Sequence, residues 1–536
     1  MPFGINYLCL LQFLSYTGDS FRLPRLATTA RESMRRGISD RATAAIATAV
    51  LIDFGIIKAG DTSCVIDRQR IRREKIQVRN EHGEKENQRL KEDCIEGIYF
   101  DGKEIDTIEN VCENGVYRRK TVKREHIVLV SQPDGKYMSH VTPTGKAAGP
   151  TTDAIFEYLE ENDLINDLKV IGMDSTNVNT GHKGGIATLL EEKRGEKLHW
   201  SVCSLHTNEL PLRHLFQALD GSTSGNNSFK GPIGKSLPHV EDLEWDENFT
   251  PISEAPPLPD LDEQVLNDLS SDQKYLYLAA KSIQSGKIDP LLRNLKPGPI
   301  SHSRWLTLGC RLCRIYLSKH AFRGKIKANL YQLVFYVITN YAPSWFLIKS
   351  RSHFAEAANH LLFQIKRLRL LPQATRNLVD PYVKSWNAHP ENLLVSLLCD
   401  EDPMLRSFAV TKIINLRDGR DLGDKSVRKF KPPPLNFSAN SISELIDWES
   451  TTIFESILTC DLKADDIRNI IMNRLELPAF PVHTQSVERA IRDLTEVCGK
   501  ICGHAERDNY LRACVASRNI FPKAETKKDF ASLVPQ

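Results

Sequence analysis

The chain of 536 residues is 41% apolar and 26% charged, which is typical of a globular protein that folds over most of its length. Its 71 basic and 68 acidic residues nearly cancel, so the net charge of +3 does not by itself identify a nucleic-acid-binding protein. Only a segregation of these charges could create a basic surface. The length is sufficient for roughly two to four domains.

The cysteines and the opening segment bear on the cellular compartment. The 12 cysteines are scattered and form no dense, evenly spaced framework. The opening residues MPFGINYLCLLQFLSY are apolar, but they lack a basic leader and an obvious cleavage site. They are also fewer than the roughly 20 residues that span a bilayer. We therefore expect no membrane partner and a reducing compartment.

Residues 1–95 are predicted to form a helical N-terminal region with a basic arm. Helical character extends over residues 21–57, where Ser39 is a suitable cap and Gly55 can end the run. The segment 68–89 is strongly charged with few apolar residues. It fits either an arm that lies on phosphates or a solvated helix, and composition alone favours the helix.

Two apolar segments that each end in a carboxylate characterise residues 96–220. Ile98 to Phe100 lead into Asp101, and Val170 to Met173 lead into Asp174. Between them we expect strands at 126–130 and 137–141 and a helix at 152–159. Together these patterns predict a mixed sheet with helices packed on it.

The chain after Asp174 passes through turn-forming residues into a helix from Ile186 that Gly195 can end. A strand at 198–202 then leads to Cys203 and His206. This Cys-x-x-His pair has no second Cys/His pair at zinc-finger spacing, so a structural role as a buried thiol and a hydrogen-bonded histidine is favoured over a zinc site.

Residues 221–270 are acidic and rich in proline, which predicts a linker without helix before Ser270, although Leu243 and Trp245 could attach it to a surface. Residues 271–475 show amphipathic helical patterns that a basic loop at 417–434 interrupts, with helix resuming at 441. The sequence thus predicts a separate helical domain.

Basic and aromatic residues cluster within this helical region. Arg304 and Trp305 begin a helix, and Arg311 and Arg314 follow near one face. They fit phosphate contact or a solvated helix equally well. Cys310 and Cys313 lie in the same helix without two further metal ligands, which disfavours a metal site.

The C-terminal segment 476–520 contains a helix whose apolar face includes Val487, Ile491 and Leu494. Glu488 lies in its first turn, where an acidic side chain ordinarily interacts with the helix dipole. Residues 521–536 form a tail.

These separated elements resemble the hAT superfamily of DNA transposases. The resemblance is carried by the two strands ending at Asp101 and Asp174, by the Arg304-Trp305 pair, and by the segments MDSTNVNTGHKGG, CSLHTNELPLRHLF and HTQSVER. More narrowly, these segments resemble transposase-derived proteins of animal genomes. The similarity covers roughly residues 95 to 520.

The resemblance implies an α+β or α/β protein with a ribonuclease-H-like mixed sheet core that a large all-α insertion domain interrupts. It assigns the catalytic and metal-binding carboxylates of the DDE type to Asp101, Asp174 and Glu488, with Mg²⁺ or Mn²⁺ as cofactor. The interval 488 − 174 = 314 residues would hold the insertion. Trp305 would stack on a displaced base, and a core residue of the helical domain is the equally favoured alternative.

The same resemblance implies a DNA partner, a homo-oligomer supported by the C-terminal segment, and nuclear residence. The chain departs from the family in its first 95 residues, which lack finger-like Cys/His spacing. Asp106 and Asp134 compete with Asp101 for the first carboxylate. An alternative to the working enzyme is a catalytically inactive, domesticated or decaying copy that acts as a DNA- or protein-interaction module.

Overall fold

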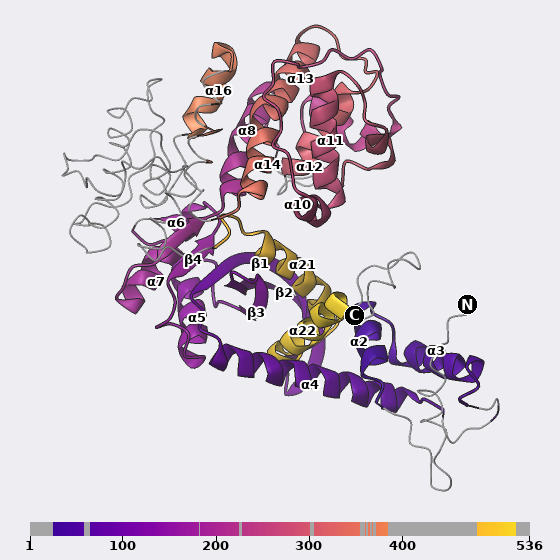
Figure 1. Ribbon diagram of the computed structural model, residues 1–536. Helices are drawn as coiled ribbons and strands as arrows, with labels where there is room; N and C mark the ends of the chain where they lie inside the picture. Colours follow the sequence, from indigo (N-terminus) through magenta and orange to yellow (C-terminus); the bar gives the residue numbers. More distant parts are fainter. Residues whose placement is uncertain are drawn as a thin grey trace, which may run out of the picture.

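The computed structural model describes residues 25–57, 60, 65–181, 183–223, 228–300, 305–353, 360, 363–364, 367, 371–383 and 480–520. Arg304, the predicted loop at 417–434, the helix predicted from 441 and the tail lie outside the described residues. Figure 1 shows a body built on a sheet and a separate group of helices beside it.

A five-stranded mixed sheet forms the centre of the body. Its strands are β1 (Gly97–Glu113), β2 (Val116–Gln132), β3 (Lys136–Val141), β4 (Val170–Met173) and β5 (His199–Val202). Their spatial order is β3-β2-β1-β4-β5. The first three strands pair antiparallel, whereas β1, β4 and β5 are parallel to one another. The predicted mixed sheet is confirmed, with β1 at its centre.

Helices cover both faces of the sheet. On one face, α5 (Ala148–Glu161) and α7 (Ile186–Arg194) pack against alternate strand residues such as Ile98 and Phe100. On the other face, α21 (Gln485–Cys498) and α22 (His504–Ile520) pack against the residues in between, including Tyr99. This alternation follows from the two-residue period of a strand. The C-terminal helices are therefore part of the sheet core (Figure 1).

Three helices precede the sheet. They are α2 (Ala27–Arg35), α3 (Asp40–Asp53) and α4 (Arg68–Glu92). The predicted cap is confirmed, because the Ser39 side chain accepts a hydrogen bond from the Ala42 amide at 3.2 Å. The charged segment from residue 68 is a long helix, as composition favoured.

The second group of helices begins with α8 (Ser204–Asp220), which leads out of the body. The other main helices are α11 (Ser271–Ser285), α12 (Trp305–Tyr316), α13 (Gly324–Tyr336), α14 (Ala342–Ser350) and α16 (Gln373–Val383). They share one apolar core that is distinct from the cores at the sheet. None of the helices among the described residues combines the length and apolar character needed to cross a bilayer.

The linker prediction for residues 221–270 is wrong. This segment contains α9 (Pro232–Ser236), the 3₁₀ helix η1 (Leu237–Asp242) and α10 (Glu263–Asp268). Its apolar residues are buried in the core of the helical group, among them Ile233 and Val240. The acidic and proline-rich composition of the segment did not indicate that these apolar residues would be buried. They pack the segment onto α11 and α12 instead of leaving it in solvent.

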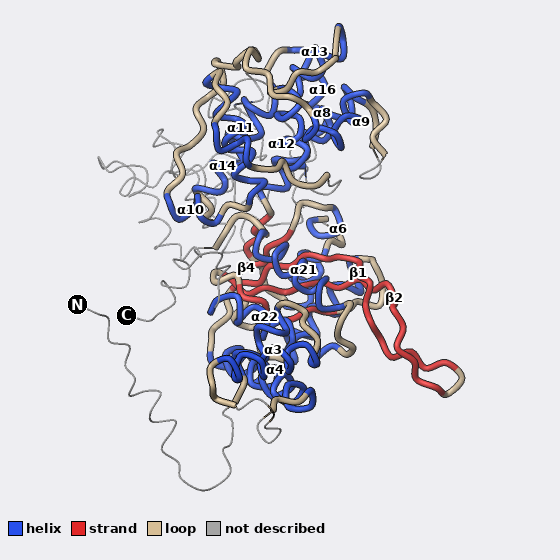
Figure 2. The backbone as a smooth tube through the Cα atoms, turned by 90° about the vertical axis from the view of Figure 1, so that its right-hand side faces the viewer, coloured by secondary structure: helices blue, strands red, loops and turns tan. Residues whose placement is uncertain are grey.

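Strands β1 and β2 are much longer than their predicted apolar cores. Their paired residues extend to Glu113 and Val116, and a turn at Asn114 and Gly115 joins them. We call residues 103–125 the hairpin arm. Figure 2 shows it as a two-stranded ribbon that reaches past the helices and ends away from the body.

Candidate functional site

Asp101 lies on β1, and Asp174 directly follows the neighbouring parallel strand β4. The register between β1 and β4 pairs Tyr99 with Gly172, and continuing it by two residues on each strand places Asp101 beside Asp174. Both side chains are half-buried. Gly172 is required for this close approach, because a Cβ there would lie 2.2 Å from the Tyr99 ring.

Local hydrogen bonds orient the Asp174 carboxylate. Its Oδ1 accepts from the Thr176 backbone N–H at 3.0 Å and from the Thr176 hydroxyl at 2.7 Å. The Asn179 side-chain amide, on the short helix α6 (Asn177–Thr180), donates to the same oxygen at 2.6 Å. Among the described residues, the hydrogen bonds that position Asp174 all end on Oδ1, which leaves Oδ2 as the oxygen available to a ligand.

Glu488 reaches the same region on the first turn of α21, where the helix dipole favours a carboxylate. The segment before this helix is fastened to the sheet. The Pro481 carbonyl accepts hydrogen bonds from Tyr99 and, at 3.0 Å, from Ser201, and the Val482 carbonyl accepts from the Ser204 amide at 3.0 Å. Strands β1 and β5 thus determine where α21 begins.

The charges of both Asp174 and Glu488 act on Asp101. Burial raises the pKa of Asp101, and the charges of Asp174 and Glu488 raise it further, to about 7, against the opposing hydrogen bond from the Gly102 amide. The two competitors for the first carboxylate lie elsewhere. Asp106 is exposed on the hairpin arm opposite Lys123, and Asp134 pairs with Lys136 in a turn.

Cys203 lies beneath this site as a buried thiol. Burial raises its pKa to about 11; hydrogen bonds from Thr484 and from the His206 backbone amide oppose that rise, and the charge of Glu488 adds to it. His206 is half-buried at the start of α8. Among the described residues, no third ligand joins these two into a metal-binding group. The structural role of the pair stays a prediction.

The two arginines predicted to contact DNA are buried instead. Arg311 donates to the carbonyls of Gly298 at 2.8 Å and Leu237 at 2.7 Å. Arg314 donates to the Leu243 carbonyl at 2.6 Å and lies 3.8 Å from the Trp245 ring centroid. The expectation of phosphate contact is corrected, because both guanidinium groups hold the segment before α11 in place.

Trp305 is also a core residue. It is 4% exposed, and its ring lies 6.0 Å from that of Phe216 on α8. Stacking on a displaced base would require this indole to leave the core of the helical group. Of the two interpretations open to the sequence, the structure favours the core residue.

Sequence reasoning missed an ion-pair group that joins the helical group to α21. Lys349 on α14 contacts Asp268 at 2.6 Å and the Gln485 side chain at 3.1 Å. Arg489 contacts the same aspartate at 3.4 Å. These residues are far apart in the sequence, and no local pattern marks them. They fix the first turn of α21, and with it Glu488, against the helices.

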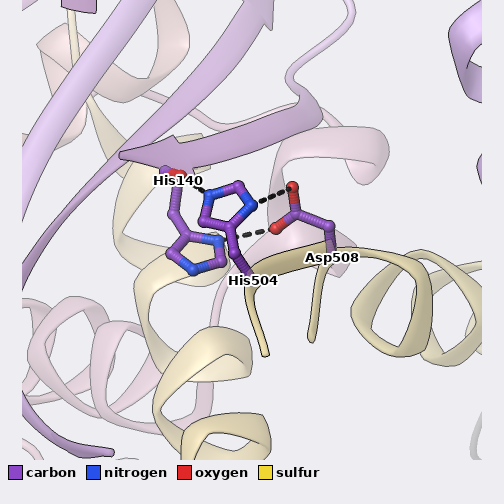
Figure 3. Close-up of side chains that lie close together, drawn as sticks. All are labelled: His140, His504 and Asp508. Atoms are coloured by element: carbon purple, nitrogen blue, oxygen red, sulfur yellow. Dashed lines mark hydrogen bonds and ion pairs between the residues drawn. The ribbon is translucent and has the colours of Figure 1, made fainter. Parts of the chain in front are cut away.

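A second polar cluster lies under β3 (Figure 3). Asp508 accepts hydrogen bonds from Tyr137, Ser139 and His140, each at 2.6 Å. His504 lies on the same helix, with its Nδ1 3.9 Å from the Asp508 carboxylate. Burial by itself raises the pKa of Asp508. The hydrogen bond from His140 and the charges of His140, His504 and Arg512 outweigh burial and lower this pKa to about 2.

His140, His504 and Asp508 are close enough to be considered as metal ligands. The two imidazole rings, however, are stacked at 4.2 Å with an interplanar angle of 23°. A ligating imidazole holds its ion near the ring plane at about 2.0 to 2.1 Å, and nearly parallel stacked rings cannot both do so. We interpret the cluster as a hydrogen-bond network that fastens α22 to β3.

Comparisons with known proteins add little to this geometry. No family model matches the chain, and no curated protein matches it. A search of solved structures pairs the chain with one from the Drosophila P element transposase strand transfer complex, with 9% identity, a TM-score of 0.29, and coverage of 95% of each chain. A TM-score of that size is too low to establish a shared fold, so the functional argument depends on the residues of this chain.

Proposed function

We propose that this chain is a transposase-derived DNA-binding protein of the hAT type, with a ribonuclease-H-like core that cuts or joins DNA phosphodiesters. The observation that carries the proposal is that the charges of Asp174, which directly follows β4, and of Glu488, on the distant helix α21, both act on Asp101 in β1. The mixed sheet, with the helical group between β5 and α21, supports it. Nuclear residence and homo-oligomerisation stay predictions from the resemblance.

The donor set fits a hard divalent cation. All three groups offer carboxylate oxygens, which Mg²⁺ and Mn²⁺ prefer. Without a cation the carboxylates repel one another, and this repulsion contributes to the raised pKa of Asp101. Asp101, Asp174 and Glu488 would hold the ions. Two such ions would activate an attacking oxygen and stabilise the leaving oxygen during displacement at a phosphodiester.

The surrounding residues prepare this arrangement. Thr176 and Asn179 fix the Asp174 carboxylate in one orientation, so no rearrangement is needed when a ligand reaches it. The hydrogen bonds from β1 and β5 to the segment before α21 hold Glu488 at the end of the sheet where both aspartates lie. The chain thus supplies a fixed, negatively charged pocket for cations.

The test is nicking of supercoiled plasmid by the purified chain with Mg²⁺ or Mn²⁺. We expect nicking that Asp174→Asn and Glu488→Gln each reduce by at least about a hundredfold, since each change removes a ligand charge. Asp134→Asn is the matched control, because Asp134 is exposed in a turn and pairs with Lys136. That variant should nick like the wild type.

Two results would contradict the enzymatic proposal. One is the absence of metal-dependent nicking on supercoiled and hairpin DNA, and the other is nicking that survives loss of Asp174. If the protein still binds DNA in either case, the alternative of an inactive DNA-interaction module replaces the enzyme. If it neither nicks nor binds DNA, both forms of the proposal fail.

A further inference from the structure

The hairpin arm is an unpartnered element built on the strand that carries Asp101. Strand β4 pairs with β1 only from Gly97 to Tyr99, and β3 pairs with β2 only from Ile127 to Ser131. Within the described residues, neither outer edge of the arm pairs with another strand. At about 3.3 Å per residue, the eleven steps along β1 from Asp101 to Cys112 span roughly 36 Å.

The base and the tip of the arm differ in burial. Ile105 and Thr107 are still buried against α21 and α22. Every β2 residue from Val116 to Thr121 is exposed, and Tyr117 at the tip is 74% exposed. The base is therefore fixed to the body, while the outer part presents its side chains to solvent (Figure 2).

Charge is segregated between the two strands of the arm. The basic residues of β2 are Arg118, Arg119, Lys120, Lys123 and Arg124, whereas acidic residues lie mainly on β1. Three of the five are compensated across the arm. Lys120 pairs with Glu113, Arg124 pairs with Glu109 at 3.1 Å, and Lys123 lies opposite Asp106.

Arg118 and Arg119 are the uncompensated pair. Their cross-strand neighbours are the uncharged residues Val111 and Asn110, and among the described residues neither arginine has an acidic partner. Successive strand residues point to opposite faces, so each face of the ribbon carries one of these two cations. A two-stranded ribbon also has the width that the major groove of a DNA duplex admits.

We propose that the hairpin arm lies along duplex DNA, with Arg118 and Arg119 contacting phosphates about one helical turn from the carboxylates. A second copy of the chain is the less suitable occupant, because the charged side chains along both edges oppose strand-to-strand pairing. This inference rests on the proposed DNA-binding function and assigns one of its contact surfaces.

The experiment measures binding of a labelled duplex of about 40 base pairs by fluorescence anisotropy between about 50 and 200 mM salt. Arg118→Ala/Arg119→Ala is compared with Lys169→Ala/Lys193→Ala. The control removes the same charge from exposed lysines outside the arm, Lys169 directly before β4 and Lys193 on α7. Circular dichroism and thermal unfolding check that all variants fold alike.

Each lost phosphate contact should reduce the slope of log K against log salt by about 0.9. The slope of the arm variant should therefore be about 1.8 smaller in magnitude than that of the wild type. Between about 50 and 200 mM salt, the factor by which the variant loses affinity should be roughly twelve times smaller than the factor for the wild type. The control should keep the wild-type slope. Arg118→Lys/Arg119→Lys should restore most of it, since a lysine also neutralises a phosphate.

The outcomes separate this inference from the proposed function. If the wild type binds no DNA, the proposed function fails. If the wild type binds DNA and the arm variant keeps its slope, the arm inference alone is overturned. It is also overturned if the variant changes the oligomeric state in sedimentation and leaves the slope intact, because the arm would then contact another copy of the chain.

Discussion

Asp101 is the carboxyl group on which the negative charges of two other carboxylates act. Its carboxyl group is half-buried and lies close to two others, so burial and the charges of Asp174 and Glu488 raise its pKa to about 7. A carboxyl group of this kind retains a proton near neutral pH unless a cation replaces it. The chemistry of the site is thus linked to pH through one side chain.

This linkage predicts a pH-dependent stability in metal-free buffer. Because the folded-state pKa of Asp101 is raised above the unfolded value, its contribution is full below about pH 4 and is lost as the pH rises through about 7. Asp101→Asn removes that contribution. The free energy of unfolding of the wild type should fall by roughly 2 to 4 kcal/mol relative to Asp101→Asn between these pH values.

Denaturant unfolding at a series of pH values measures this difference, with Asp134→Asn as the control that follows the wild type. Added Mg²⁺ should reduce the loss above pH 7, since a ligand of the folded state stabilises it. A wild type and an Asp101→Asn variant that respond identically to pH would show that Asp101 titrates normally.

The sequence identifies which side chains are charged, but it does not indicate which of them become buried in the fold. Arg311 and Arg314 looked like available cations, yet the carbonyls that bind them come from segments up to 74 residues away in sequence. The assignment of the three carboxylates to one site came from the order that the resemblance supplied. Asp174 and Glu488 are 314 positions apart, and no local sequence pattern indicates that their charges act on the same residue.

At the scale of single elements, the buried network on Asp508 holds α22 against β3. Asp508→Ala removes the acceptor for Tyr137, Ser139 and His140 at once and leaves their polar groups buried. We expect a loss of about 3 kcal/mol in the free energy of unfolding. Chemical denaturation measures it, and Glu506→Ala on the same helix, whose side chain is exposed, should cost less than about 1 kcal/mol.

The same network predicts a second pH effect of opposite sign. The folded-state pKa of Asp508 is lowered to about 2, so its stabilising contribution is present above about pH 4 and is lost as the pH falls toward 2. The difference between wild type and Asp508→Ala should therefore shrink in acid. A difference that stays constant down to about pH 2 would contradict an ionised Asp508 in the fold.

Element boundaries were predictable where a local chemical signal exists. Ser39 caps α3, and Gly195 ends α7 with a φ of 80°, as their residue types indicated. The hairpin arm was missed because its outer strand residues are charged and do not alternate with apolar ones. Asn114 and Gly115, both at positive φ, were the available signal for its turn.

At the scale of the whole molecule, the chain forms two groups of elements with separate apolar cores. The sheet and its covering helices share two clusters, and α8 to α16 share another. The C-terminal helices return to the sheet after the chain has built the helical group. The sheet core is therefore completed only by residues beyond 480, which no reading of the first 220 residues could reveal.

This division predicts that the two groups lose structure separately. Leu494 is fully buried between α21 and the sheet, so Leu494→Asp places an unpaired charge there and should cost more than about 4 kcal/mol. Hydrogen exchange read by mass spectrometry should show lost amide protection in β1 to β3 and retained protection in α11 to α14. Arg492→Asp, on the exposed side of the same helix, should retain protection in both groups. Uniform loss of protection across the chain in Leu494→Asp would mean that the sheet and the helices fold as one cooperative unit, and that the carboxylate site cannot be uncoupled from the helical group.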